Sequence, residues 1–175
     1  KGIEYSRNLM TVRIAKILGL DKILDLSKKL EIYEEIPELL SVSLGAAETT
    51  LINLTSAYAP FVNGGKKIEP NLISRIQDRR GKTIFQKKNR ECVGCDKFIN
   101  QSSEYPKIQN TNNQAISKET AYQMTSILRG AVERGTAKKL KSLKVPLAGK
   151  TGTTNDNFDA WFIGFSSNLV IGVYI

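Results

Sequence analysis

Histidine is absent from this chain of 175 residues, and no other feature of the composition excludes as much chemistry. Neither a Ser-His-Asp nor a Cys-His catalytic arrangement can form within the chain. A zinc site that uses imidazole ligands is excluded as well. Acid–base chemistry near pH 7 must therefore use lysine, a carboxylate, tyrosine or cysteine with a shifted pKa.

Long apolar runs are also lacking, since no stretch approaches the roughly 18 apolar residues that span a membrane. The nearest stretch, 160–175, is interrupted by Ser166-Ser167-Asn168 and predicts two strands with a turn between them. Hydrophobic residues make up 41% of the chain and charged residues 25%, which is typical of a folded domain and not of a disordered segment.

Acidic residues are fewer than basic ones, 17 against 26, so the formal charge is +9. Much of the excess lies in two segments. Residues 65–91 carry nine basic and three acidic side chains, and residues 134–150 carry six basic side chains and no acidic one. Such segments are typical of proteins with an anionic partner, and equally of a solvated lysine-rich surface.

Helices are predicted from the spacing of apolar residues and from capping signals over 9–18, 21–30, 48–62 and 118–133. Gly19 ends the first helix. Ser117 caps the last one, whose apolar face is predicted to comprise Tyr122, Ile127, Leu128 and Ala131. Residues 39–44 are predicted to form a loop or a short strand.

Strand patterns appear in the second half of the chain. Residues 72–77 and 83–86 flank Asp-Arg-Arg-Gly and predict a β-hairpin, whereas the polar residues 87–114 predict a long loop. Further strands are predicted at 147–153, 160–165 and 169–175. This order favours an α+β fold. The predicted organisation is one partial domain over 1–175: a helical part over about 1–65, a hairpin at 72–86, a loop insertion at 87–114, a helix at 117–133 and strands within 147–175.

The segment Gly149-Lys150-Thr151-Gly152-Thr153-Thr154 carries the clearest motif. A phosphate-binding loop needs a further glycine at position 144, where this chain has lysine, so that interpretation fails. Lys-Thr-Gly on a strand is instead one of the motifs of penicillin-binding proteins and β-lactamases, which also use Ser-x-x-Lys and a second serine motif. The sequence Ser6-Arg7-Asn8, ahead of the first helix, fits a Ser-x-Asn version of that second motif.

Further blocks follow in the same order along the chain, at 43–46, 54–59, 61–65, 133–137, 148–156 and 159–164. Together they resemble the transpeptidase domain of class A, bifunctional penicillin-binding proteins, which synthesise peptidoglycan. The resemblance covers nearly all of the chain except about 87–114. It implies the fold of penicillin-recognising serine transferases, the β-lactamase/transpeptidase-like fold, an antiparallel sheet covered by helices that is incomplete here at the N-terminus.

The resemblance also implies that this is the C-terminal part of a longer protein. In the family, the Ser-x-x-Lys segment with the acylated serine, the glycosyltransferase domain and the membrane anchor all lie upstream. We therefore expect peptidoglycan stem peptides and β-lactams as partners, a location in the periplasm or otherwise outside the cytoplasmic membrane, no cofactor and no metal. The chain alone is expected to be inactive.

Residue roles are carried over from the family motifs. Ser6 would relay a proton near the nucleophile, Lys150 would place positive charge beside it, and Asn8 would bind the acyl-donor peptide. The strand would bind substrate through Thr151, Gly152, Thr153 and Thr154, and the backbone N–H of Thr153 would form half of an oxyanion hole. As single residues, Ser6 would more often cap a helix and Lys150 would more often be a solvated strand lysine.

The sequence leaves three features open. Trp161 and Phe162 are predicted to lie in the core, with a substrate platform as the alternative, and Thr136 either lines the cleft or caps a helix. The pair Cys92 and Cys95 is half of a zinc site without a second half. In a periplasmic domain this pair would form a loop disulfide, and free thiols are the alternative.

Two other functions compete with the transpeptidase hypothesis. The first is a non-catalytic peptidoglycan-binding or partner-binding module of the same fold. The second is a basic nucleic-acid-binding domain, which we do not expect because its motifs are missing and aromatic residues do not alternate with the basic ones.

Overall fold

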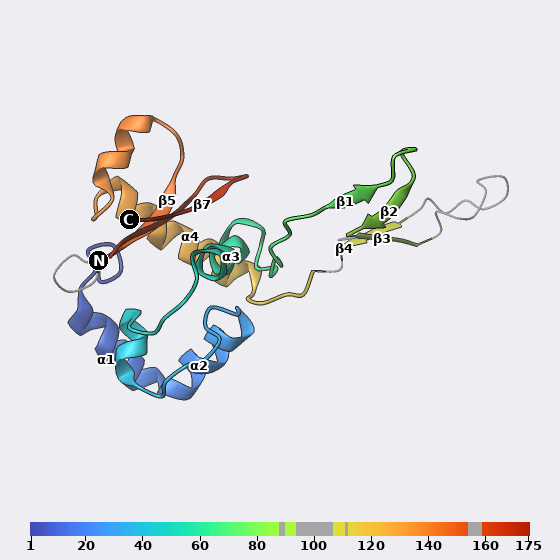
Figure 1. Ribbon diagram of the computed structural model, residues 1–175. Helices are drawn as coiled ribbons and strands as arrows, with labels where there is room; N and C mark the ends of the chain where they lie inside the picture. The colour runs from blue at the N-terminus through green and yellow to red at the C-terminus, as the bar shows by residue number, and fades with distance from the viewer. Residues whose placement is uncertain (88–89, 94–106, 111, 154–158) are drawn as a thin grey trace. The chain divides into compact units, whose positions relative to one another are not determined.

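The computed structural model describes residues 1–87, 90–93, 107–110, 112–153 and 159–175. These residues form two compact units, one made of 1–68 together with 114–175 and the other of 69–113 (Figure 1). The second unit is larger than the loop insertion expected at 87–114, because it also includes the predicted hairpin.

A three-stranded antiparallel sheet lies in the first unit. Its strands are β5 (Ala148–Thr153), β6 (Ala160–Phe165) and β7 (Val170–Tyr174), in the order β5-β6-β7. Lys150 lies opposite Ile163 and Gly152 lies opposite Trp161. The strands occupy the ranges that the sequence predicts to within two residues. Strands β6 and β7 are runs of apolar and β-branched residues next to turn residues, whereas β5 carries the Lys-Thr-Gly motif.

Two helices cover this sheet: α4 (Lys118–Glu133) packs against β5, and α3 (Leu51–Val62) packs against β7. As predicted, Ser117 caps α4, because its side chain accepts a hydrogen bond from Thr120 N. Helix α3 begins three residues later than predicted, because the cap is Thr50, whose hydroxyl accepts from Asn53 N.

The core between helices and sheet is built on Leu128, Ala148 and Phe165. The rings of Tyr58 and Phe61 pack against it, each with its centroid 6.4 Å from that of Phe165. Burial raises the pKa of Tyr58 to about 12.

The predicted apolar face of α4 is wrong at one position, since Tyr122 is exposed. The buried residues Ala121, Leu128 and Ala131 define the face that meets the sheet. Tyr122 follows Ala121 directly, so its side chain lies about 100° further around the helix. The amphipathic pattern therefore located the helix correctly and misplaced one edge of its buried stripe.

The remaining helices of this unit are α1 (Asn8–Leu18), α2 (Leu20–Lys29) and the 3-10 helices η1 (Leu40–Leu44) and η2 (Lys138–Leu143). Gly19 ends α1, as predicted. The prediction of a loop or strand at 39–44 is wrong. The segment packs against α1, and its turn closes locally, with Gly45 N donating to Val42 O at 2.9 Å.

The second unit contains two antiparallel strand pairs. Strands β1 (Arg75–Gln77) and β2 (Thr83–Gln86) form the predicted hairpin, although β1 is shorter than expected. Strands β3 (Arg90–Val93) and β4 (Lys107–Asn110) also pair, so the prediction of a loop throughout 87–114 is wrong. Strands β3 and β4 are far apart in sequence and consist largely of polar residues. They therefore show no alternation of apolar and polar residues by which a sequence pattern could detect the pair. Cys92 lies in β3, Cys95 lies outside the described residues, and their disulfide stays a prediction.

Within the ranges that the structure describes, no helix is long and apolar enough to cross a membrane.

Candidate active site

Ser6 lies in a tight turn directly before α1. Its N–H donates to Ile3 O at 3.2 Å, and Arg7 N donates to Gly2 O at 2.9 Å. The φ angle of Ser6 is 51°, in the left-handed region that costs a residue with a Cβ about 1 kcal/mol. Such conformations concentrate at functional sites. The N-cap of α1 is Arg7, so capping does not explain the serine.

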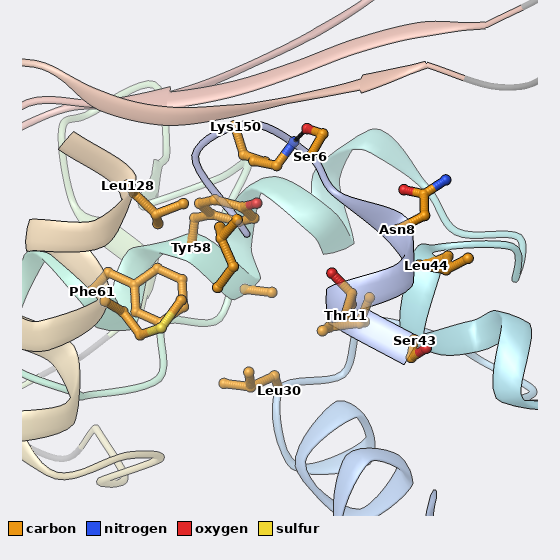
Figure 2. A pocket seen from close by; sticks show the side chains of 14 residues that line it. Ser6, Asn8, Thr11, Leu30, Ser43, Leu44, Tyr58, Phe61, Leu128 and Lys150 are labelled. Carbon is orange, nitrogen blue, oxygen red and sulfur yellow. Dashed lines mark hydrogen bonds between the residues drawn. The ribbon is translucent and has the colours of Figure 1, made fainter. Parts of the chain in front are cut away.

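Lys150 points from the middle of β5 toward this turn. Its Nζ donates to Ser6 Oγ and to Thr151 O, the latter at 2.6 Å (Figure 2). The lysine is half-buried, and burial lowers its pKa because the charged ammonium loses hydration. An ammonium with a lowered pKa next to a hydroxyl is suited to proton transfer. The lysine is therefore not simply a solvated strand residue.

A cavity of about 310 Å³ opens beside this pair. Ser6, Lys150 and Asn8, the first residue of α1, supply polar groups to its lining, and Tyr58 and Phe61 are among its apolar wall residues. In Figure 2, Ser6 and Lys150 meet at one edge of the cavity, and Asn8 projects from the start of α1. The three residues predicted to be catalytic thus line one cavity, although only two of them are in contact.

Thr151 forms a different contact. Its Oγ1 lies 2.8 Å from Oγ1 of Thr136, in the segment that follows α4. Thr136 N also donates to Glu4 O at 3.1 Å. The position of Thr136, which the sequence left open, is therefore at the junction between β5, the end of α4 and the turn that carries Ser6.

A second cavity, of about 570 Å³, is lined by the far end of β5. Its wall includes the exposed residues Gly152 and Thr153 together with Trp161 and Tyr174, whose ring centroids are 4.6 Å apart. The prediction that Trp161 lies in the core is therefore wrong, since it is half-buried and lines this cavity. Its partner ring is on β7, beyond the reach of a local pattern. Thr154 lies outside the described residues.

Comparison with known proteins identifies the family. A family model for the penicillin-binding protein transpeptidase domain matches residues 1–174. The chain belongs to this family. The penicillin-binding proteins 1A of Rickettsia prowazekii and Rickettsia conorii are 45% and 43% identical to it, over 180 and 178 residues and 99% of the chain. The chain spans about a fifth of these relatives, 22% of each.

Solved penicillin-binding proteins show the same fold. The crystal structure of penicillin-binding protein 1A from Haemophilus influenzae has a TM-score of 0.80 and 28% identity, over 99% of this chain and 29% of that one. The imipenem acyl-enzyme of penicillin-binding protein A from Mycobacterium tuberculosis, at 18% identity and TM-score 0.73, shows the fold alone; the match covers 99% of this chain and 41% of that one. The resemblance to class A penicillin-binding proteins and the predicted fold are thereby confirmed.

The motifs did not reveal two residues that matter to this geometry. Glu4 and Arg134 form an ion pair beside the Ser6 turn, 130 residues apart in sequence. Charged residues at that separation carry no pattern that identifies them as partners. Among the described residues, no cluster of His, Cys, Asp or Glu is suited to holding a metal ion.

Proposed function

We propose that this chain is part of a serine-type D-Ala-D-Ala transpeptidase that cross-links peptidoglycan by acyl transfer. The observation that carries the proposal is the hydrogen bond from Lys150 Nζ to Ser6 Oγ, which joins two family motifs 144 residues apart in sequence. The family model and the class A relatives support the same reaction type.

The acylated serine belongs to the family's Ser-x-x-Lys motif, and no serine of these 175 residues is followed by lysine at the third position after it. We infer that another segment of the longer protein supplies it. Its hydroxyl oxygen forms an ester bond with the carbonyl carbon of the penultimate D-alanine, and the amide bond to the terminal D-alanine breaks. The hydroxyl proton passes to the leaving amine. The amine nitrogen of a second stem peptide then attacks the ester carbonyl carbon. A new amide bond forms, the ester C–O bond breaks, and the amine proton returns to the serine oxygen.

In this reaction the Lys150–Ser6 pair relays the proton beside the nucleophile. Thr151 and Thr153 bind the substrate carboxylate, Gly152 allows close approach to the strand, and Thr154 also binds substrate. The backbone N–H of Thr153 stabilises the developing oxyanion, a contribution on the order of 3 kcal/mol in other acyl-transfer enzymes.

Asn8, at the edge of the cavity, hydrogen-bonds the acyl-donor peptide. We also propose β-lactams as acylating ligands, because a solved structural relative is described as an imipenem acyl-enzyme complex. The other proposed partners are the upstream glycosyltransferase domain and an upstream membrane anchor, with this domain on the extracytoplasmic side. Nucleic acid is not among them.

Covalent labelling of the full-length protein by a fluorescent penicillin tests this function. We expect a label that survives denaturation and that Lys150→Ala nearly abolishes, because proton transfer typically contributes about a hundredfold or more to the rate. The control is Lys139→Ala, an exposed lysine in η2, which should label normally. Normal labelling of Lys150→Ala would remove the role assigned to the lysine. An unlabelled wild type that still binds peptidoglycan would favour the non-catalytic module.

A further inference from the structure

The turn that carries Ser6 is held at Glu4. The carboxylate of Glu4 is buried, with 7% of its side chain exposed, and it accepts two hydrogen bonds from one guanidinium. Arg134 Nε lies 3.1 Å from Oε2 and Nη2 lies 2.5 Å from Oε1. This two-point geometry is the strongest that a side-chain ion pair offers, and the pair lowers the pKa of Glu4.

The backbone around this ion pair leaves no spare space. A Cβ at Gly130 would lie 2.5 Å from Glu4 Oε1 and 2.6 Å from Arg134 Nη2, and a Cβ at Gly135 would overlap Glu4 O. Glycine at these two positions lets the end of α4 approach the turn closely enough for both contacts. The ion pair is therefore a close-packed contact and not an incidental surface one.

A closed series of contacts runs from this ion pair to the proposed proton relay. Glu4 O accepts from Thr136 N, and the Thr136 hydroxyl contacts that of Thr151, the neighbour of Lys150 on β5. Lys150 Nζ then donates to Ser6 Oγ, two residues after Glu4. The turn, the end of α4 and β5 are thus connected pairwise.

We propose that the Glu4–Arg134 ion pair positions the Ser6 hydroxyl on Lys150 for the reaction. This inference rests on the proposed transpeptidase function. Neither residue touches the reacting atoms, so both are positioning residues. Ser6 keeps an unfavourable φ angle, and the anchor at Glu4 prevents the turn from relaxing away from the lysine.

The first test measures the rate of acylation by a fluorescent penicillin in the full-length protein carrying Glu4→Gln, Arg134→Gln or both. A misplacement of about 1 Å can slow a reaction about a hundredfold, so we expect each variant to lose between about tenfold and a hundredfold. The double variant should lose no more than either single one, because both remove the same contact.

The matched control is Glu133→Gln. Its carboxylate contacts Arg129 Nε at 2.6 Å and Arg134 Nη1 at 3.6 Å, so the change alters the same surface without touching the Ser6 turn. Acylation of the control should equal that of the wild type. Arg134→Lys, which keeps the charge but loses the two-point geometry, should fall between wild type and Arg134→Gln. Unchanged acylation in folded Glu4→Gln protein would overturn the inference.

A second readout does not depend on activity. Trace labelling of Lys150 with acetic anhydride across a pH series, read by mass spectrometry, reports the pKa of this amine. Release of the turn would hydrate the ammonium, so its pKa should rise in Glu4→Gln and Arg134→Gln and stay constant in Glu133→Gln. A constant pKa in all three variants would contradict the inference.

The two proposals fail in different ways. A wild-type protein that no penicillin acylates would reject the transpeptidase function, while the Lys150 labelling would still decide whether Glu4 and Arg134 position the turn. If Glu4→Gln does not fold, Arg134→Lys, a change at the exposed partner of the ion pair, allows the acylation rate and the pKa of Lys150 to be measured instead.

Discussion

The two compact units contain antiparallel strands of very different character. In the unit of 1–68 and 114–175, β6 places Ile163, Gly164 and Phe165 in the interior, with helices over the sheet. In the unit of 69–113, every residue of β1 and β2 is exposed. Burial of apolar side chains stabilises the strands of the first unit. In the second unit, β1 and β2 are stabilised by the backbone hydrogen bonds between the strands and by a turn. The candidate active site lies wholly in the first, which suggests that its chemistry depends on a rigid, packed scaffold.

The two units should differ most in the unfolding free energy that is lost when one phenylalanine in each is replaced by alanine. Phe165 is 4% exposed among Leu128, Ala148 and Phe61, whereas Phe85 on β2 is 46% exposed. Phe165→Ala should lower the free energy of unfolding by about 3–5 kcal/mol through lost burial and a cavity. Phe85→Ala should lower it by less than about 1 kcal/mol. Denaturant unfolding combined with hydrogen exchange measures both, and equal losses would contradict the comparison.

Alkaline pH should weaken the packed unit through Tyr58. Its pKa is about 12 in the folded protein and about 10 when unfolded, so the unfolded chain loses the phenol proton first. This stabilisation of the folded state is complete below about pH 10 and is lost between about pH 10 and 12, by up to about 3 kcal/mol. Tyr58→Phe should lack this loss. Hydrogen exchange of β5–β7 amides measures the difference, and identical pH profiles would contradict it.

The smallest expected effect lies in the hairpin turn. Asp78 Oδ1 accepts from Arg80 N at 2.8 Å and from Lys82 N at 2.9 Å. Asp78→Ala should cost the hairpin about 1 kcal/mol and speed amide exchange in β1 and β2. Penicillin acylation of the full-length protein should stay at the wild-type rate. A loss of acylation would show that the second unit contributes to the site.

The predictability of each feature follows from the range of the interactions that form it. Helix α4 and strands β5 to β7 carry local patterns and a Ser117 cap, so their ranges were predicted within two residues. The β3–β4 pair and the cavity position of Trp161 depend on distant partners, and the sequence misassigned them. The 3-10 helix at Leu40–Leu44 closes through local hydrogen bonds that no periodic pattern of apolar residues marks, and it was misassigned as well. Ser6 and Lys150 were expected close to each other only because the family motifs place both beside the nucleophile, and Glu4–Arg134 has no such signal.

The pairing of β5 with β6 has a consequence for where charge is placed. Successive strand residues face opposite sides, so a slip of one residue would exchange the sides of Lys150 and Thr151. The ammonium would then point away from Ser6. Ala148 pairs with Phe165 and Lys150 with Ile163, and burial of Phe165 and Ile163 opposes such a slip. The buried apolar residues of β6 thus fix the register of β5, and this register determines on which side of the sheet a proton can be exchanged.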